Sequence, residues 1–166
     1  MKVTDEFVFF FTNRDIFSNW YIASFKINEM YFNCVEQYMM YQKAKLFHDR
    51  ETAIRIMNTE EPAKQKMLGR LVKDFDDTQW VKYRLDFVKD ACVAKYRQNP
   101  ELLKILLETD SKTIVEASPY DRIWGIGLAK DHPDIENPRK WRGLNLAGKA
   151  LMIARKILKK EQTNVQ

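Results

Sequence analysis

The sequence predicts an α+β fold: a single, mostly helical domain with a small N-terminal β-sheet. The apolar run "EFVFFFT" at 6–12 has the length and composition of a buried strand. Most of the chain after residue 33 instead has apolar residues at helical spacing. A length of 166 residues, with no internal repeat and no linker, is that of one domain (1–166, with a core of about 6–160).

Two further segments are expected to form strands. "SFKINEMYF" at 24–32 predicts a hairpin that turns at Asn28 and Glu29, although the usual glycine is missing. "KTIVEAS" at 112–118 predicts a single strand. Residues 119–143 hold three of the five prolines and three of the five glycines, and we expect a long irregular segment of the functional or mobile kind.

The expected helices have clear start and stop signals. One spans 33–47, a short one follows Asp49, and another has Pro62 in its first turn, where the missing N–H costs little. A long helix at 78–97 ends before Asn99, and a further one follows it. The apolar stripe of the long helix comprises Val81, Leu85, Val88, Cys92 and Tyr96. That of the last helix comprises Leu146, Ala150, Ile153 and Ile157, and 161–166 are expected to be a disordered tail.

Composition limits the possible functions. No apolar run approaches the ~20 residues that span a bilayer, and the N-terminus lacks a signal-peptide pattern, so we expect a cytoplasmic protein without membrane contact. Cys34 and Cys92 lie in apolar helical patterns and are interpreted as buried free thiols. The only histidines, His48 and His132, are far apart, so we expect no metal and no cofactor. The net charge of +5 suits phosphate-bearing ligands or nucleic acid without requiring either.

Glu36 and Lys43 are the first candidate site residues. They lie seven positions apart in "NCVEQYMMYQKAKLF", which places them only about 20° apart around a helix. The same face carries apolar residues, namely Phe32, Met39, Met40 and Phe47. The pair is interpreted either as two solvated surface charges or as one wall of a buried site, and the geometry alone leaves both open.

Three other features exceed what a core needs, and each has a plain structural alternative. Asp121, Trp124 and Gly125 lie in "SPYDRIWGIGL", which is either a site or simply a turn. Ser18 and Asn19 in "FSNW" are either a polar contact to a ligand or a capped turn. Trp80 either packs in the core or offers a platform for a flat heterocycle.

Taken in order, six blocks of the sequence resemble the YbiA-like or NADAR family. The resemblance runs from about Phe9 to Leu158 and predicts the YbiA-like fold. The blocks are "FSNW", "VEQYMMYQKA", "MLGR", Trp80, "VEASPYDRIWGIGL" and "GLNLAGKALM". Ala147, where the family usually carries leucine, and the insertion-like segment 129–141 depart from its pattern and put the choice of substrate in doubt.

The resemblance implies an N-glycosidase. Members hydrolyse ribosylamines of early riboflavin intermediates or remove ADP-ribose from guanine in nucleic acid, so the implied partner is a nucleotide-like riboside or such a modified guanine. The catalytic residues of the family fall on Glu36, Asp121 and Lys43. The expected substrate-binding residues are Trp80, Trp124, Ser18, Asn19, Arg70, Gly125 and Asn145.

Two mechanisms and a rival function remain open at this point. Glu36 and Asp121 would act as a carboxylate pair, as in O-glycoside hydrolysis. Alternatively, the amine of Lys43 would attack the opened sugar and form a Schiff base, if burial lowers its pKa. The rival function is a non-catalytic module that binds ADP-ribose or nucleic acid, which would not need to keep a carboxylate pair and a lysine together.

Overall fold

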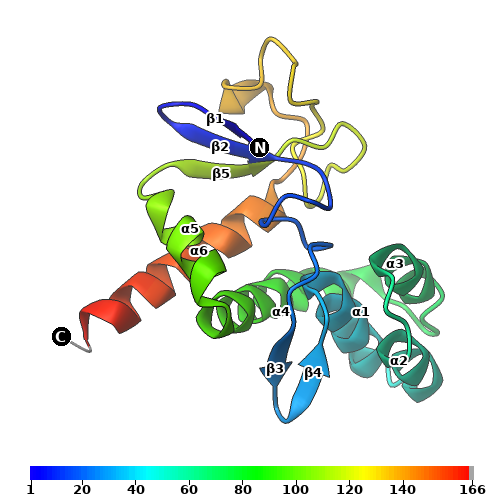
Figure 1. The fold of residues 1–166 in the computed structure, drawn as a ribbon. Coiled ribbons are helices and arrows are strands. Elements are labelled where there is room, and N and C mark those ends of the chain that lie inside the picture. Colours follow the sequence, from blue (N-terminus) through cyan, green and yellow to red (C-terminus); the bar gives the residue numbers. More distant parts are fainter. Residues whose placement is uncertain (165–166) are drawn as a thin grey trace. The chain divides into compact units, whose positions relative to one another are not determined.

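The structure is a computed structural model that describes residues 1–164. The chain forms two compact units, one built from residues 1–18 together with the chain from Pro100 onward, and one from 19–99. Between them the described residues hold six α-helices, a three-stranded sheet and a two-stranded sheet, so the prediction of a mostly helical α+β fold is confirmed (Figure 1). No helix in this described range is both long and apolar enough to cross a bilayer.

The first unit is organised around the three-stranded sheet. Strand β2 (Phe7–Phe10) lies between β1 (Lys2–Val3), which is antiparallel to it, and β5 (Thr113–Glu116), which is parallel. All four residues of β2 are buried, as expected of a strand covered on both faces. The sheet is therefore not purely N-terminal, because its third strand comes from the segment predicted at 112–118. Phe9 of β2 and Val115 of β5 pack in one cluster with Ile126, Leu128 and Ile135 from the segment after β5.

The helices of this unit are α5 (Pro100–Glu108) and α6 (Leu146–Thr163), with a short 3₁₀ helix at Pro138–Lys140. Helix α6 packs on β5. Its predicted apolar stripe is partly wrong, because Ile153 is 38% exposed. The buried side instead follows Ala147, Ala150, Leu151, Ala154 and Leu158. Helix α6 also includes residues 161–163 of the expected tail, while 165–166 lie outside the described residues.

The second unit begins with the predicted hairpin, formed by β3 (Phe25–Ile27) and β4 (Met30–Phe32). Asn28 and Glu29 both have positive φ, of 48° and 63°, as a two-residue hairpin turn of type I′ requires. Asparagine tolerates this region better than most residues, whereas glutamate does not. The Lys26 ammonium lies 2.7 Å from the Glu29 carboxylate across this turn.

Four helices complete this unit: α1 (Val35–Leu46), α2 (Arg50–Met57), α3 (Pro62–Arg70) and α4 (Asp77–Gln98). Helix α1 packs against the other three (Figure 1). The buried Asp49 caps α2, because its side chain accepts a hydrogen bond from the Thr52 amide. The prediction that Cys34 and Cys92 are buried free thiols is confirmed.

Gly148, in the first turn of α6, provides a test of packing against helix propensity. By propensity alone, Gly148→Ala would stabilise the helix by roughly 1 kcal/mol. A Cβ atom at Gly148 would however collide with the carbonyl oxygen of Ile114 in β5, which is backbone that cannot rotate away. We therefore expect Gly148→Ala to lower the free energy of unfolding by roughly 1–3 kcal/mol.

Urea denaturation measures this change, and Lys149→Ala, at the exposed neighbouring position of the same helix, is the control. The control should change stability by less than about 0.5 kcal/mol. A Gly148→Ala variant that is more stable than the parent would contradict the close approach of α6 to β5.

Candidate functional site

Four of the predicted site residues come together in the second unit. Glu36 and Lys43 lie on α1, Arg70 is the last residue of α3, and Trp80 is in the first turns of α4. The charges of Glu36 and Arg70 both act on the pKa of Lys43. The Lys43 ammonium also lies 5.8 Å from the centre of the Trp80 ring. The packing of α1 against α3 and α4 thus gathers these side chains around Lys43.

Glu36 is buried, with an exposed fraction of 3%, so the interpretation of this residue as a solvated surface charge is wrong. It lies in the first turn of α1, where its amide donates a 2.9 Å hydrogen bond to the carbonyl of Asn19. The predicted Asn19 therefore contacts the same turn through its backbone. A carboxylate in such surroundings is the kind of group that enzymes use to carry or accept protons.

Lys43 is half-buried among aromatic rings. Its ammonium lies 4.1 Å from the centre of the Phe75 ring, a cation–π distance. Burial lowers the pKa of Lys43, opposed by the negative charges of Asp77 and Glu36, while Arg70 lowers it further. A lowered pKa increases the fraction of neutral amine, the form that attacks a carbonyl carbon.

Trp80 is 7% exposed and packs near Phe87, with 6.0 Å between ring centres. Its helix begins at the cap residue Asp76, whose side chain accepts a hydrogen bond from the Thr78 amide. The structure therefore gives Trp80 a packing role and a contact with the Lys43 ammonium. Stacking on a heterocycle stays a prediction for this residue.

Lys95 is the residue of this region that sequence reasoning missed. Its exposed fraction is 1%, and its ammonium lies 5.1 Å from the Tyr21 ring centre and 5.2 Å from that of Tyr96. Burial lowers its pKa to about 8, against the opposing influence of Cys92 and Cys34. The signal was present, since position 95 follows the predicted core residue Val88 by seven and so shares its helix face.

Cys34 links Lys95 to the Glu36 region. Burial raises the pKa of the Cys34 thiol to about 12, and the charges of both Glu36 and Lys95 also act on it. The thiol itself donates a 3.2 Å hydrogen bond to Gln65. The second unit therefore contains two lysines with lowered pKa values. Lys43 interacts electrostatically with the buried Glu36, and Lys95 interacts with Cys34, on which Glu36 also acts.

The other predicted residues lie in the first unit and form a second group. One oxygen of Asp121, Oδ1, accepts hydrogen bonds from the amides of Ile123 (2.8 Å) and Trp124 (2.7 Å), which makes the turn rigid. A Cβ at Gly125 would lie 2.9 Å from the Asp121 carbonyl oxygen, so this turn requires glycine. Ser18 is half-buried, and its backbone amide donates a hydrogen bond to the carbonyl of Asp15.

The predicted ligand contact Asn145 has a structural function in this unit. Its side-chain amide donates to the Ile114 carbonyl at 2.9 Å, and its side-chain oxygen accepts from the Glu116 amide at 3.0 Å. It is buried and adopts a left-handed conformation with φ of 52° immediately before α6. Both ends of the side chain thus connect β5 to the start of the helix, and a role in binding stays a prediction.

The NADAR domain family model matches residues 9–159. The chain belongs to this family. A protein of Acanthamoeba polyphaga mimivirus named as an N-glycosidase is 45% identical over 160 residues, covering 90% of this chain and 94% of its own length. An N-glycosidase of Nostoc punctiforme is 28% identical over 145 residues, covering 86% and 85% respectively.

The fold agrees with this assignment. The NMR structure of the E. coli protein YbiA superimposes with a TM-score of 0.78 over 98% of this chain and 90% of the other, at 24% sequence identity. Both the resemblance inferred from the sequence blocks and the expected YbiA-like fold are therefore confirmed.

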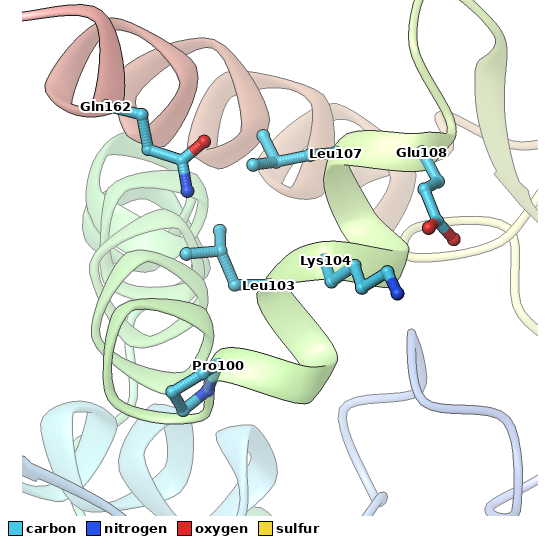
Figure 2. A pocket seen from close by; sticks show the side chains of 6 residues that line it. All are labelled: Pro100, Leu103, Lys104, Leu107, Glu108 and Gln162. Atoms are coloured by element: carbon cyan, nitrogen blue, oxygen red, sulfur yellow. The ribbon is translucent and has the colours of Figure 1, made fainter. Parts of the chain in front are cut away.

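A pocket of about 380 Å³ between α5 and α6 contains none of the predicted residues (Figure 2). Leu103 and Leu107 lie on the side of α5 that faces Gln162 of α6, while Lys104 and Glu108 point away from it (Figure 2). This shallow groove has a carboxylate beside an ammonium at its rim and no buried polar group. We therefore do not assign the reaction to it.

The lowered pKa of Lys95 predicts a particular dependence of stability on pH. The unfolded lysine keeps its proton up to about pH 10.4, so between pH 8 and 10.4 the unfolded state binds more protons than the folded state. Folding is thus penalised below pH 8, and the penalty disappears as the pH rises. Relative to Lys95→Met, the parent should gain roughly 2–3 kcal/mol of unfolding free energy between pH 8 and 10.4.

Urea denaturation at several pH values measures this difference, and Lys89→Met on the same helix is the control. Lys89 is paired with Asp86 at 3.0 Å, which raises its pKa, so its variant should show no such gain over this range. A stability difference between parent and Lys95→Met that stays constant from pH 8 to 10.4 would contradict the lowered pKa.

Proposed function

We propose that this chain hydrolyses the bond between ribose and an exocyclic amine of a heterocycle, either ADP-ribosylated guanine or an early ribosylaminopyrimidine of riboflavin synthesis. The chain is a hydrolase of N-glycosyl bonds, as its family and its N-glycosidase relatives indicate. The observation that carries the proposal is the buried Glu36 on the same helix face as Lys43, with Arg70 and Trp80 around them.

Glu36 is proposed to be the general acid and base. Cleavage requires a proton on the leaving nitrogen and stabilisation of the positive charge that grows on the sugar carbon. A buried carboxyl is suited to hold a proton, since desolvation disfavours its charged form. After giving that proton to the nitrogen, the carboxylate would take one back from the attacking water or amine.

A lysine is proposed to act as the nucleophile in the alternative route through a Schiff base. Ring opening leaves an iminium between the sugar carbon and the exocyclic nitrogen, and the neutral lysine amine adds to that carbon. The protonated heterocyclic amine then leaves, and water hydrolyses the remaining lysine Schiff base to the free sugar. Lys43 remains the residue that the family pattern indicates. Lys95 is the comparison residue: its pKa of about 8 leaves a larger neutral fraction near pH 7 than an ordinary lysine has, but its side chain is only 1% exposed.

Substrate recognition is proposed to use the positive charges near Lys43. Arg70, at the end of α3, is a candidate for a phosphate contact, since guanidinium groups bind phosphate oxygens in pairs. Asp121 is proposed to position the sugar or a water molecule through Oδ2, because Oδ1 already holds the turn. A phosphate contact is needed both for a ribosylamine phosphate and for ADP-ribose.

Glu36→Gln should lower turnover by about 10²–10⁴-fold, because an amide has nearly the same shape but cannot exchange a proton. Two substrates are incubated separately, an ADP-ribosylated guanine oligonucleotide and the pyrimidine ribosylamine, and release of the base is followed by chromatography. Glu51→Gln changes an exposed carboxylate of α2 and should leave the rate unchanged.

Near-normal turnover in Glu36→Gln would show that the central assignment is incorrect. If the parent protein releases base from neither substrate at high enzyme concentration, the enzyme proposal fails for both, and a non-catalytic binding module becomes the better interpretation.

Borohydride trapping distinguishes the candidate nucleophiles. If a Schiff base forms on Lys43, the trapped adduct seen by mass spectrometry in the parent should disappear in Lys43→Ala and persist in Lys95→Met. The opposite pattern would assign the bond to Lys95. Peptide mapping of the adduct locates the modified lysine directly, so a variant that is merely destabilised does not confuse the result.

Absence of an adduct in the parent during active turnover would rule out the covalent route and favour the carboxylate mechanism. Lys64→Ala, at an exposed lysine whose ammonium lies 2.6 Å from Glu61, serves as the control and should leave trapping unaffected.

A further inference from the structure

A second concavity in the 19–99 unit is distinct from the Glu36 region. This α1–α2 pocket, about 490 Å³, is lined by the C-terminal part of α1, one side of α2 along its whole length and Met30 of the β3–β4 hairpin. Its basic lining residues are Lys45, His48 and Arg50, and its apolar ones include Met30, Tyr41 and Met57. The volume falls within the range of small-molecule sites.

The pocket lies on the side of α1 opposite to the proposed reaction face. Tyr41 is about 140° from Glu36 around the helix and Lys45 about 180°, whereas Lys43 is only about 20° away. A ligand here would therefore not contact Glu36 or Lys43. Binding in this pocket therefore does not depend on the proposed N-glycosidase activity.

The charges at the rim have no counter-ion within the part of the chain that the structure describes. The two carboxylates that flank Arg50 in sequence are engaged elsewhere. Asp49 accepts hydrogen bonds from the amides of Thr52 and Lys73, each at 3.0 Å, and Glu51 lies 3.1 Å from the Lys73 ammonium. Lys45 and Arg50 form no ion pair among residues 1–164. The rim thus presents a positive potential that favours an anion.

The floor of the pocket is apolar and held in place by its own contacts. The Tyr41 ring packs on Phe32 with 5.6 Å between centres, and its hydroxyl donates to the Met30 sulfur at 3.4 Å. Ala53 is buried beneath, and Met57 is half-buried beside it. Thioether groups adapt their shape to aromatic rings and attract them, so this floor suits a planar ring system.

His48 adopts a backbone conformation that is uncommon for a residue with a side chain. Its φ is +58°, held by a 3.1 Å hydrogen bond from its amide to the Lys45 carbonyl and a 2.9 Å bond from Asp49 to Ala44. These two hydrogen bonds form a Schellman motif that ends α1, so the end of the helix fixes this conformation. Here the conformation places the imidazole in the pocket lining between Lys45 and Arg50.

We propose that the α1–α2 pocket binds a small aromatic phosphate of mononucleotide size. The phosphate lies at the rim formed by Lys45, His48 and Arg50, and the ring lies on the floor formed by Tyr41 and the methionines. The separation of a positive rim from an apolar floor within one pocket favours a compact ligand with both features over a bare anion or an extended strand.

Titration of the full-length ¹⁵N-labelled protein with adenosine 5′-monophosphate tests this site. We expect chemical-shift changes at the amides of Arg50, Ala53 and Ile54, with saturation in the micromolar to low millimolar range. Lys45→Gln and Arg50→Gln should each weaken this binding about tenfold, the effect of one charge-assisted contact to phosphate. Arg55→Gln, an exposed arginine of the same helix outside the pocket, should not change it.

Adenosine and inorganic phosphate, titrated separately, should each bind at least tenfold more weakly than the nucleotide. Equal affinity for either fragment, or equal affinity in all three variants, would overturn the proposal. So would shift changes confined to residues around Glu36 and Lys43. An oligonucleotide that binds with affinity rising with length, while the mononucleotide causes no shifts, would identify a nucleic-acid surface instead. None of these measurements depends on turnover.

Discussion

Helix α1 must bury a carboxylate, and much of the second unit is arranged around this requirement. A buried carboxylate such as that of Glu36 is costly unless its surroundings compensate. Three helices pack against α1, so that Arg70 of α3 lies in electrostatic range of Lys43, and Lys95 of α4 in range of Cys34. The charge of Glu36 acts on both Lys43 and Cys34. The same packing removes water from two lysines and lowers their pKa values. Burial of the lysines themselves thus favours their neutral form, while the charge of Glu36 opposes this effect at Lys43.

In the first unit, a long and mostly irregular segment joins β5 to α6 and is held by hydrogen bonds. Backbone hydrogen bonds join the 121–127 turn to the 142–147 segment, including Arg142 to Ile126 at 2.8 Å and Leu144 to Arg122 at 2.9 Å. Asp121 and Asn145 complete this arrangement with their side chains. Residues that the family pattern marks as functional are therefore also needed for the backbone geometry, and substitutions there test both roles at once.

Local signals in the sequence predicted the elements well. The hairpin at Asn28, the short helix after Asp49 and Pro62 at the start of α3 all appear as expected, because turns and helix starts depend on neighbouring residues. The helical stripes were less accurate. Val81 and Ile153 are exposed, and Trp80 and Arg84 are buried instead of Val81. Apolar residues were available on more than one side of these helices, and only the partner elements determine which side is covered.

The sequence by itself determined the fold class, the family and the shared face of Glu36 and Lys43, since these follow from helical periodicity and from the order of short motifs. Only the tertiary structure decided that Glu36 is buried, that Lys95 is a second lysine of lowered pKa, and that Asn145 bonds to β5. It also revealed the α1–α2 pocket, whose basic residues give no motif. Burial and electrostatic shifts depend on residues distant in sequence, and their contacts exist only once the helices have packed.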